Sequence, residues 1–200
     1  MNKNIQFALQ VFEKQNSVMR SAQIFKQGIQ PRTLYQMRDD RFVVAEGRGL
    51  YRLANSSLWS DPDLAIVSLR IPKGVICLIS ALYFHHITTQ IPYEVYVALP
   101  KDTEKPRIHH PPTRFFWVSS EPFEAGIETH RMDGVEIKVY GVAKTIADCF
   151  KFRNKIGMDV ALEALREGLR GKKCTPDQIL HFARVDRVEH VILPYLETLA

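Results

Sequence analysis

The chain has 200 residues, a length that suits one large domain or two small ones. Hydrophobic residues make up 46% of it, an ordinary fraction for a globular protein, which excludes wholesale disorder. The sequence has no run of about 18 apolar residues, and residues 1–20 lack the continuous apolar segment of a signal peptide. We therefore expect a folded protein that does not associate with membranes and lies in the cytoplasm.

The excess of positive charge lies in the first quarter of the chain. The net charge is +5, and residues 1–55 hold nine basic side chains against four acidic ones, whereas the remainder holds 18 of each. This asymmetry predicts a module that binds a polyanion, joined to a neutral module. A modest basic excess can also serve solubility alone, so charge by itself leaves both interpretations open.

Three short helices are predicted within residues 1–40. The first has an apolar face with i, i+3, i+4, i+7 spacing, formed by Ile5, Ala8, Leu9 and Phe12. After a polar break at 15–17, a second helix is expected from Ser21 to Gln27, with Ala22 and Phe25 on one face and Gly28 at its end.

The third helix is predicted to begin at Pro31, because proline fits the first turn of a helix, and to bury Leu34 and Met37. A β-hairpin follows, with strands at 42–46 and 50–53 and a turn at 47–49 that carries Arg48 at its tip. Two helices joined by a short glycine-containing turn and followed by a hairpin predict a winged helix-turn-helix in residues 1–55.

A winged helix-turn-helix predicts double-stranded DNA as its partner. Arginine can donate to guanine, glutamine can pair with adenine, and threonine can contact a phosphate or a thymine methyl group. Side chains at the start of the second helix are expected to contact phosphates. The predicted DNA-binding residues are Arg20, Ser21, Arg32, Thr33, Tyr35, Gln36, Arg38 and Arg48. Three alternatives stay open: these side chains are merely solvated, Tyr35 packs against the hairpin, or the module binds protein.

Residues 60–200, after a polar connector at 55–57, predict an α+β domain with a small antiparallel sheet and a helical C-terminal half. Strands are expected at 93–99 and 114–119, separated by an exposed loop at 101–112. The dipeptide Asp133-Gly134 predicts a hairpin between strands 127–132 and 135–140. Helices are expected from Pro62, over 75–84, 142–152 and 158–169, after a capping box at Thr175, and finally up to a stop or kink at Pro194.

Residue patterns for catalysis are weak. Glu136 and Lys138, with Asp133 nearby, match half of a metal-dependent nuclease site, but alternate charged residues on a hairpin strand more often form its solvent face. The paired histidines (85–86 and 109–110) lack the i, i+4 spacing of a zinc-binding helix. The three cysteines are far apart and form no CxxC pair. We expect no enzyme activity, no metal and no cofactor, and keep a DNA-targeted nuclease as the alternative.

Several segments resemble the AbiEi-type antitoxins of type IV toxin–antitoxin systems, which act in phage abortive infection. The similar segments are residues 19–23, 28–29, 48–53, 71–74, 77–82, 139–140, 143–148 and 161–165. The resemblance implies a repressor that binds inverted repeats in its own promoter, as two copies that meet on DNA. It also implies a C-terminal domain that opposes a nucleotidyltransferase-like toxin.

The resemblance assigns no antitoxin contact to a residue. Ser80, Thr145 and Asp148 are expected to be structural, and Lys144 is expected at the surface near the sheet edge. A solitary relative without a toxin, or an interaction module without an operator, remains an alternative.

Overall fold

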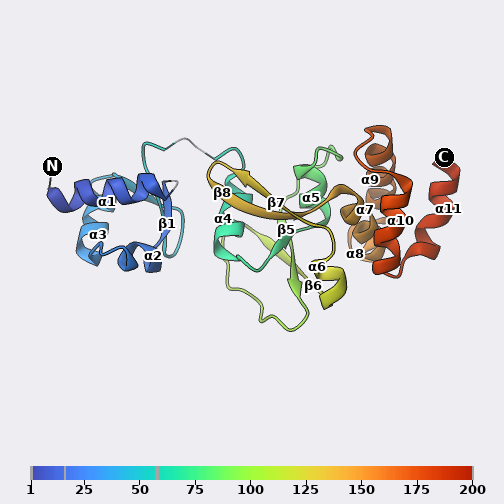
Figure 1. Cartoon of the computed structure of the whole chain (residues 1–200), viewed down its shortest axis with the longest axis horizontal. Helices are drawn as coiled ribbons and strands as arrows, with labels where there is room; N and C mark the ends of the chain where they lie inside the picture. The colour runs from blue at the N-terminus through green and yellow to red at the C-terminus, as the bar shows by residue number, and fades with distance from the viewer. Residues whose placement is uncertain (1, 16, 57–58, 200) are drawn as a thin grey trace. The chain divides into compact units, whose positions relative to one another are not determined.

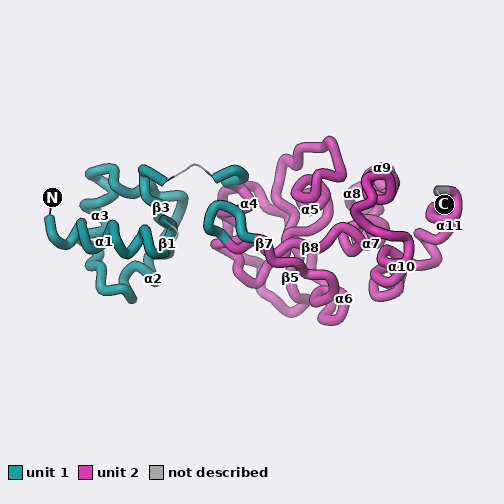
Figure 2. Tube along the Cα trace, turned by 45° about the horizontal axis from the view of Figure 1, so that its top comes forward, with its two compact units in different colours: residues 1–62, 131–135 teal, residues 63–130, 136–200 magenta. Residues whose placement is uncertain are grey.

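The computed structural model describes residues 2–15, 17–56 and 59–199 of an α+β protein that is about half helical. The chain forms two compact units, one of residues 1–62 with 131–135 and one of residues 63–130 with 136–200 (Figure 2). The division into domains at 1–55 and 60–200 stays a prediction. Asn16 and Ser57, which belong to the two expected polar breaks, lie outside the described residues.

The first unit combines short helices with a three-stranded antiparallel sheet of order β1-β3-β2. Its elements are α1 Lys3–Lys14, β1 Val18–Arg20, α2 Ser21–Lys26, α3 Pro31–Asp39, β2 Val43–Ala45 and β3 Leu50–Leu53 (Figure 1). The predicted helices and hairpin are present, whereas the sequence did not indicate β1. This strand has only three residues and is stabilised by pairing with β3, where Met19 lies opposite Tyr51.

The core of this unit lies between the helices and the sheet. Phe12, Leu34 and Met37 are fully buried there, as their spacing predicted. The expected apolar face of α2 was wrong, because Ile24 is its buried residue and Phe25 is 38% exposed. The reason is local: Ile29, just after the helix, returns to donate its N–H to the Ile24 carbonyl and covers that side.

The second unit is built on a five-stranded sheet of order β6-β5-β4-β8-β7. Its strands are β4 Val75–Ile76, β5 Val95–Pro100, β6 Thr113–Val118, β7 Ile127–Met132 and β8 Val135–Tyr140. The β5–β6 and β4–β8 pairs are parallel, whereas β4 and β5 are antiparallel. The expected small antiparallel sheet was therefore wrong for this part of the chain. The sheet is mixed because β4 pairs with the distant β8, and because the long connection between β5 and β6 lets these consecutive strands run parallel. The local patterns of the strands encode neither pairing.

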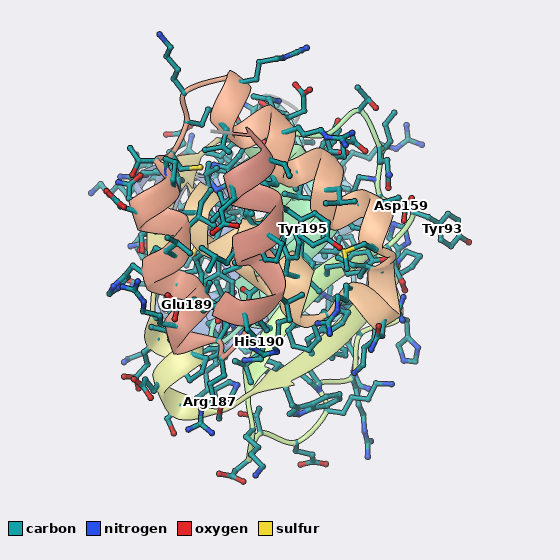
Figure 3. All side chains as sticks on the ribbon, turned by 90° about the vertical axis from the view of Figure 1, so that its right-hand side faces the viewer. Tyr93, Asp159, Arg187, Glu189, His190 and Tyr195 are labelled. Carbon is teal, nitrogen blue, oxygen red and sulfur yellow. The ribbon has the colours of Figure 1, made fainter. Side chains whose placement is uncertain are left out.

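The remaining elements are helical. They are α4 Pro62–Arg70, α5 Leu78–Phe84, α6 Ser120–Glu124, α7 Val142–Lys151, α8 Arg153–Ile156, α9 Met158–Arg170, α10 Pro176–Val185 and α11 Glu189–Leu199. The helix expected over 75–84 is shorter, because the β-branched Val75 and Ile76 pair with β5. Pro194 lies inside α11 and does not end it. On this helix, Tyr195 packs against Phe150 and Glu189 pairs with Arg184. Figure 3 labels Tyr195 and Glu189.

Two local predictions are confirmed in detail. Asp133 and Gly134 both have positive φ, +51° and +81°, as a two-residue hairpin turn of this type requires. At the start of α10, the Thr175 side chain accepts the Gln178 N–H at 3.3 Å, and the Gln178 side chain accepts the Thr175 N–H at 2.9 Å. Within the described ranges, no helix combines the length and the apolar character needed to cross a bilayer.

Candidate nucleic-acid interface

The outer face of α3 carries four of the eight predicted DNA-binding side chains. Arg32, Tyr35 and Gln36 are exposed, while Leu34 and Met37 point into the core. Thr33 departs from the prediction: it is only 9% exposed, because its position on the helix shares the buried side with Leu34 and Met37. It is therefore not available as a surface contact.

Arg38 is exposed but forms an ion pair with Asp39. Its Nε and Nη2 atoms donate to the same carboxylate oxygen of Asp39, at 3.0 and 2.8 Å, and its guanidinium lies 5.4 Å from the centre of the Tyr35 ring. The hydrogen bond that Arg38 donates to Asp39 raises the pKa of Arg38, so the group stays charged. Tyr35 is 47% exposed. Its ring contacts the guanidinium of Arg38.

The start of α2 and the turn of the β2–β3 hairpin lie side by side. The Ser21 N–H donates to the Gly49 carbonyl at 2.9 Å, and Arg20 is paired with Leu50 in the sheet. Gly49 has φ +73°, and a Cβ there would lie 3.1 Å from the Ser21 hydroxyl, so the close approach depends on glycine. Arg48 is exposed on this turn. The fold thus brings together the residues that we predicted as phosphate contacts.

Arg52 has a structural place in the same unit that the sequence did not reveal. It is 7% exposed, and its Nε donates to Glu46 at 2.8 Å. Its Nη1 donates to the Leu53 carbonyl at 3.1 Å and to the Ser56 hydroxyl at 2.9 Å. All four residues of β3 are buried. Through these bonds Arg52 holds the chain that follows β3.

A second candidate site lies in the other unit, where a cavity of about 260 Å³ opens near the start of α7. Its polar lining consists of His85, Glu128, Lys173, Cys174 and Gln178. Most of these groups are bonded within the fold. The His85 Nε2 lies 2.8 Å from the Tyr140 carbonyl, and Lys173 donates to the His85 and His86 carbonyls.

Titration in this cavity does not favour nucleophilic chemistry. Burial raises the pKa of Cys174 to about 11, which keeps it a thiol at neutral pH. Burial also lowers the pKa of His85. Among the residues that the structure describes, no three His, Cys, Asp or Glu side chains are grouped so that they could hold a metal ion. Glu136 is exposed on β8, and Lys138 donates to the Pro72 carbonyl at 3.4 Å.

A buried ion network joins α7 to the end of α10. Lys144 is fully buried, which corrects its expected place at the surface, and its Nζ lies 2.6 Å from Asp148 and 2.9 Å from Asp186. Lys151 reaches Asp186 at 3.0 Å. The two carboxylates raise the pKa of Lys144 although burial opposes the charge, and burial raises the pKa of Asp148 to about 7.

Ser80 and Thr145 have the structural roles expected of them. The Ser80 hydroxyl accepts the Tyr96 N–H at 2.9 Å, and the Thr145 hydroxyl donates to the Tyr140 carbonyl at 3.0 Å. Both hydroxyls therefore fasten the ends of strands to neighbouring helices. Neither is free to act on a ligand.

Comparison with known proteins identifies the fold and nothing more specific. No family model matches the chain, and no curated protein matches its sequence. Among solved structures, the chain is similar to the crystal structure of the RV2827C protein from Mycobacterium tuberculosis, with a TM-score of 0.60 and 11% sequence identity. The match covers 91% of this chain and 71% of that one. At this identity the similarity extends to the fold alone.

Proposed function

We propose that this protein is a transcriptional regulator that binds double-stranded DNA sequence-specifically through a winged helix-turn-helix formed by α1 to β3. The order of elements supports it: α2 and α3 are joined by a turn in which Gly28 has φ +85°, and the β2–β3 hairpin follows. In this assignment α3 enters the major groove and the hairpin turn with Arg48 meets the backbone.

The observation that carries the proposal is the contact between Ser21 and Gly49. It holds the start of α2 against the hairpin turn, so Arg20, Ser21 and Arg48 can contact phosphates from one surface. Arg32 and Gln36, exposed on α3, are then the candidates for reading base edges, and Arg38 is a further donor if it leaves Asp39.

The antitoxin role is a further part of the proposal and rests on the resemblance of the chain to AbiEi-type antitoxins. In that role the protein represses its own promoter at an inverted repeat, as two copies that meet on DNA. Residues 60–200 oppose a nucleotidyltransferase-like toxin. Co-purification of a toxin encoded beside the gene, and loss of its effect on growth when this chain is present, would test this part separately from DNA binding.

A mobility-shift titration against the DNA upstream of the gene, with a random duplex as competitor, tests DNA binding. We expect a shift that resists the competitor. Gln36→Ala should weaken binding to the upstream DNA more than to the random duplex, by about 1–3 kcal/mol. Arg48→Ala should weaken binding to both by a similar factor, because phosphates carry no sequence.

A control and two contrary outcomes complete the test. Arg166→Ala removes an exposed arginine from α9 in the other unit and should leave binding unchanged. No shift at moderate salt would reject DNA binding and leave the first unit as a module for protein partners. Equal effects of Gln36→Ala and Arg48→Ala on every sequence would show that α3 is not the recognition helix.

A further inference from the structure

The outer face of α3 carries a carboxylate among the candidate DNA contacts. Arg32, Tyr35 and Asp39 follow the i, i+3, i+7 spacing of one helix face, and the Asp39 side chain is 65% exposed. A carboxylate on a surface that approaches phosphates repels them. The presence of Asp39 on this face, where it opposes DNA binding, therefore needs an explanation.

Helix stability does not supply that reason. Asp39 is the last residue of α3, and Asp40 is its C-cap. Negative charge at the C-terminal end of a helix opposes the helix dipole. The ion pair with Arg38 is exposed on both sides, and exposed pairs add little to stability. The fold therefore gains little or nothing from Asp39.

The geometry around Arg38 supplies a different reason. Two donors of the guanidinium, Nε and Nη2, converge on one oxygen of Asp39, and the Tyr35 ring lies beside the guanidinium. Nε and Nη2 form an edge that arginine commonly uses to grip a phosphate. Asp39 occupies this edge as a phosphate of another molecule would.

We propose that Asp39 is a specificity-determining residue that keeps Arg38 from the phosphates of arbitrary DNA. The inference rests on the proposed DNA binding. In a non-specific complex α3 is not held at one position, so a freed Arg38 can settle on a phosphate, and withholding this arginine removes a full phosphate contact. In the cognate complex, base contacts by residues such as Gln36 hold α3 at one position, so a freed Arg38 gains less from the phosphates and withholding it costs less binding free energy. Asp39 thereby raises the ratio of cognate to random binding.

The test is Asp39→Asn in the full chain, titrated with a random duplex and with the upstream DNA at several salt concentrations. We expect binding to the random duplex to tighten by about fivefold, with a log–log salt slope steeper by about 0.9, the value for one added phosphate contact. Binding to the upstream DNA should tighten less, so the specificity ratio falls.

Asp40→Asn is the matched control, because it removes the same charge from the neighbouring exposed residue, which is not in an ion pair among the described residues. It should give a smaller gain and a smaller change of slope. In an Arg38→Ala background, the gain in DNA binding from Asp39→Asn should shrink to the gain from Asp40→Asn. The melting temperature of Asp39→Asn should be unchanged or higher, whereas a merely structural ion pair would lower it.

The outcomes separate this inference from the proposed function. Two results would reject the restraint by Asp39 while leaving DNA binding by the wild type in place. In one, Asp39→Asn and Asp40→Asn tighten DNA binding equally; in the other, the effect of Asp39→Asn is undiminished in the Arg38→Ala background. If neither the wild type nor Asp39→Asn binds any duplex, both are rejected. Binding of the random duplex by Asp39→Asn alone would also reject both, because a native protein that binds no DNA has no specificity for Asp39 to determine.

Discussion

Single residues decide whether the hairpin turn can lie against α2. Gly28 and Gly49 both have positive φ, +85° and +73°, but their surroundings differ. A Cβ at Gly28 would meet nothing within 4 Å, whereas one at Gly49 would lie 3.1 Å from the Ser21 hydroxyl. An alanine at Gly28 therefore meets backbone strain alone, whereas an alanine at Gly49 meets backbone strain and steric crowding.

We predict that Gly28→Ala lowers the free energy of unfolding by about 1–2 kcal/mol, the cost of a left-handed alanine. Gly49→Ala should cost more, because the added methyl group also pushes the turn away from Ser21. Urea denaturation of both full-length variants measures the difference. Gly49→Ala should in addition weaken DNA binding, since Arg48 moves with the turn. Equal unfolding energies would show that the contact with Ser21 does not constrain the turn.

At the scale of elements, the fully buried Lys144 links α7 to the end of α10. Lys144 meets Asp148 and Asp186, while Lys151 is 26% exposed and meets Asp186 alone. Removing a buried charge leaves its partners uncompensated, which costs more than the pair itself contributes. The two lysines thus form a natural comparison on one helix.

Lys144→Met should lower the free energy of unfolding by about 3–5 kcal/mol, because two buried carboxylates lose their shared cation. Lys151→Met should cost much less, since Asp186 keeps Lys144 and the Lys151 side chain is itself partly exposed. Chemical denaturation monitored by circular dichroism distinguishes the two. Similar losses would mean that burial of the network in solution differs from the structure.

Asp148 makes this network sensitive to pH. Its pKa in the folded protein is about 7, above the value of about 4 for an unfolded aspartate. Between these values the folded state binds more protons than the unfolded state, so the contribution of this group to stability is greatest at low pH and is lost as pH rises towards 7. From pH 5 to pH 7, the free energy of unfolding should fall more for the wild type than for Asp148→Asn. Parallel changes in both proteins would contradict the raised pKa.

At the scale of the whole molecule, the excess charge lies in the first quarter of the chain, and the remainder is neutral. DNA binding should therefore depend on salt through the first unit alone. The combined change Arg20→Ala and Arg48→Ala should reduce the magnitude of the log–log salt slope by about 1.8, two contacts at about 0.9 each. Arg166→Ala, the control from α9, should leave the slope unchanged. An equal change with both variants would indicate a general charge effect without a defined interface.

Much of the local structure could be read from sequence. The helices around Phe12, Leu34 and Met37, the Asp133-Gly134 hairpin and the cap at Thr175 are set by contacts between residues a few positions apart. Such contacts leave a periodic or turn signature, because the helix and the hairpin each impose a fixed spacing on buried and exposed positions. The exposure of Arg32, Tyr35 and Gln36 follows from the same periodicity.

Other features are decided only by the tertiary structure. The strand β1, the parallel pairing of β4 with β8 and the burial of Lys144 against Asp186 depend on partners that local patterns do not identify. The sequence by itself determined the local elements and the distribution of charge, because both are properties of neighbouring residues. Tertiary structure decided which charged side chains are buried, such as Lys144 and Arg52, because burial brings together residues from separate parts of the chain.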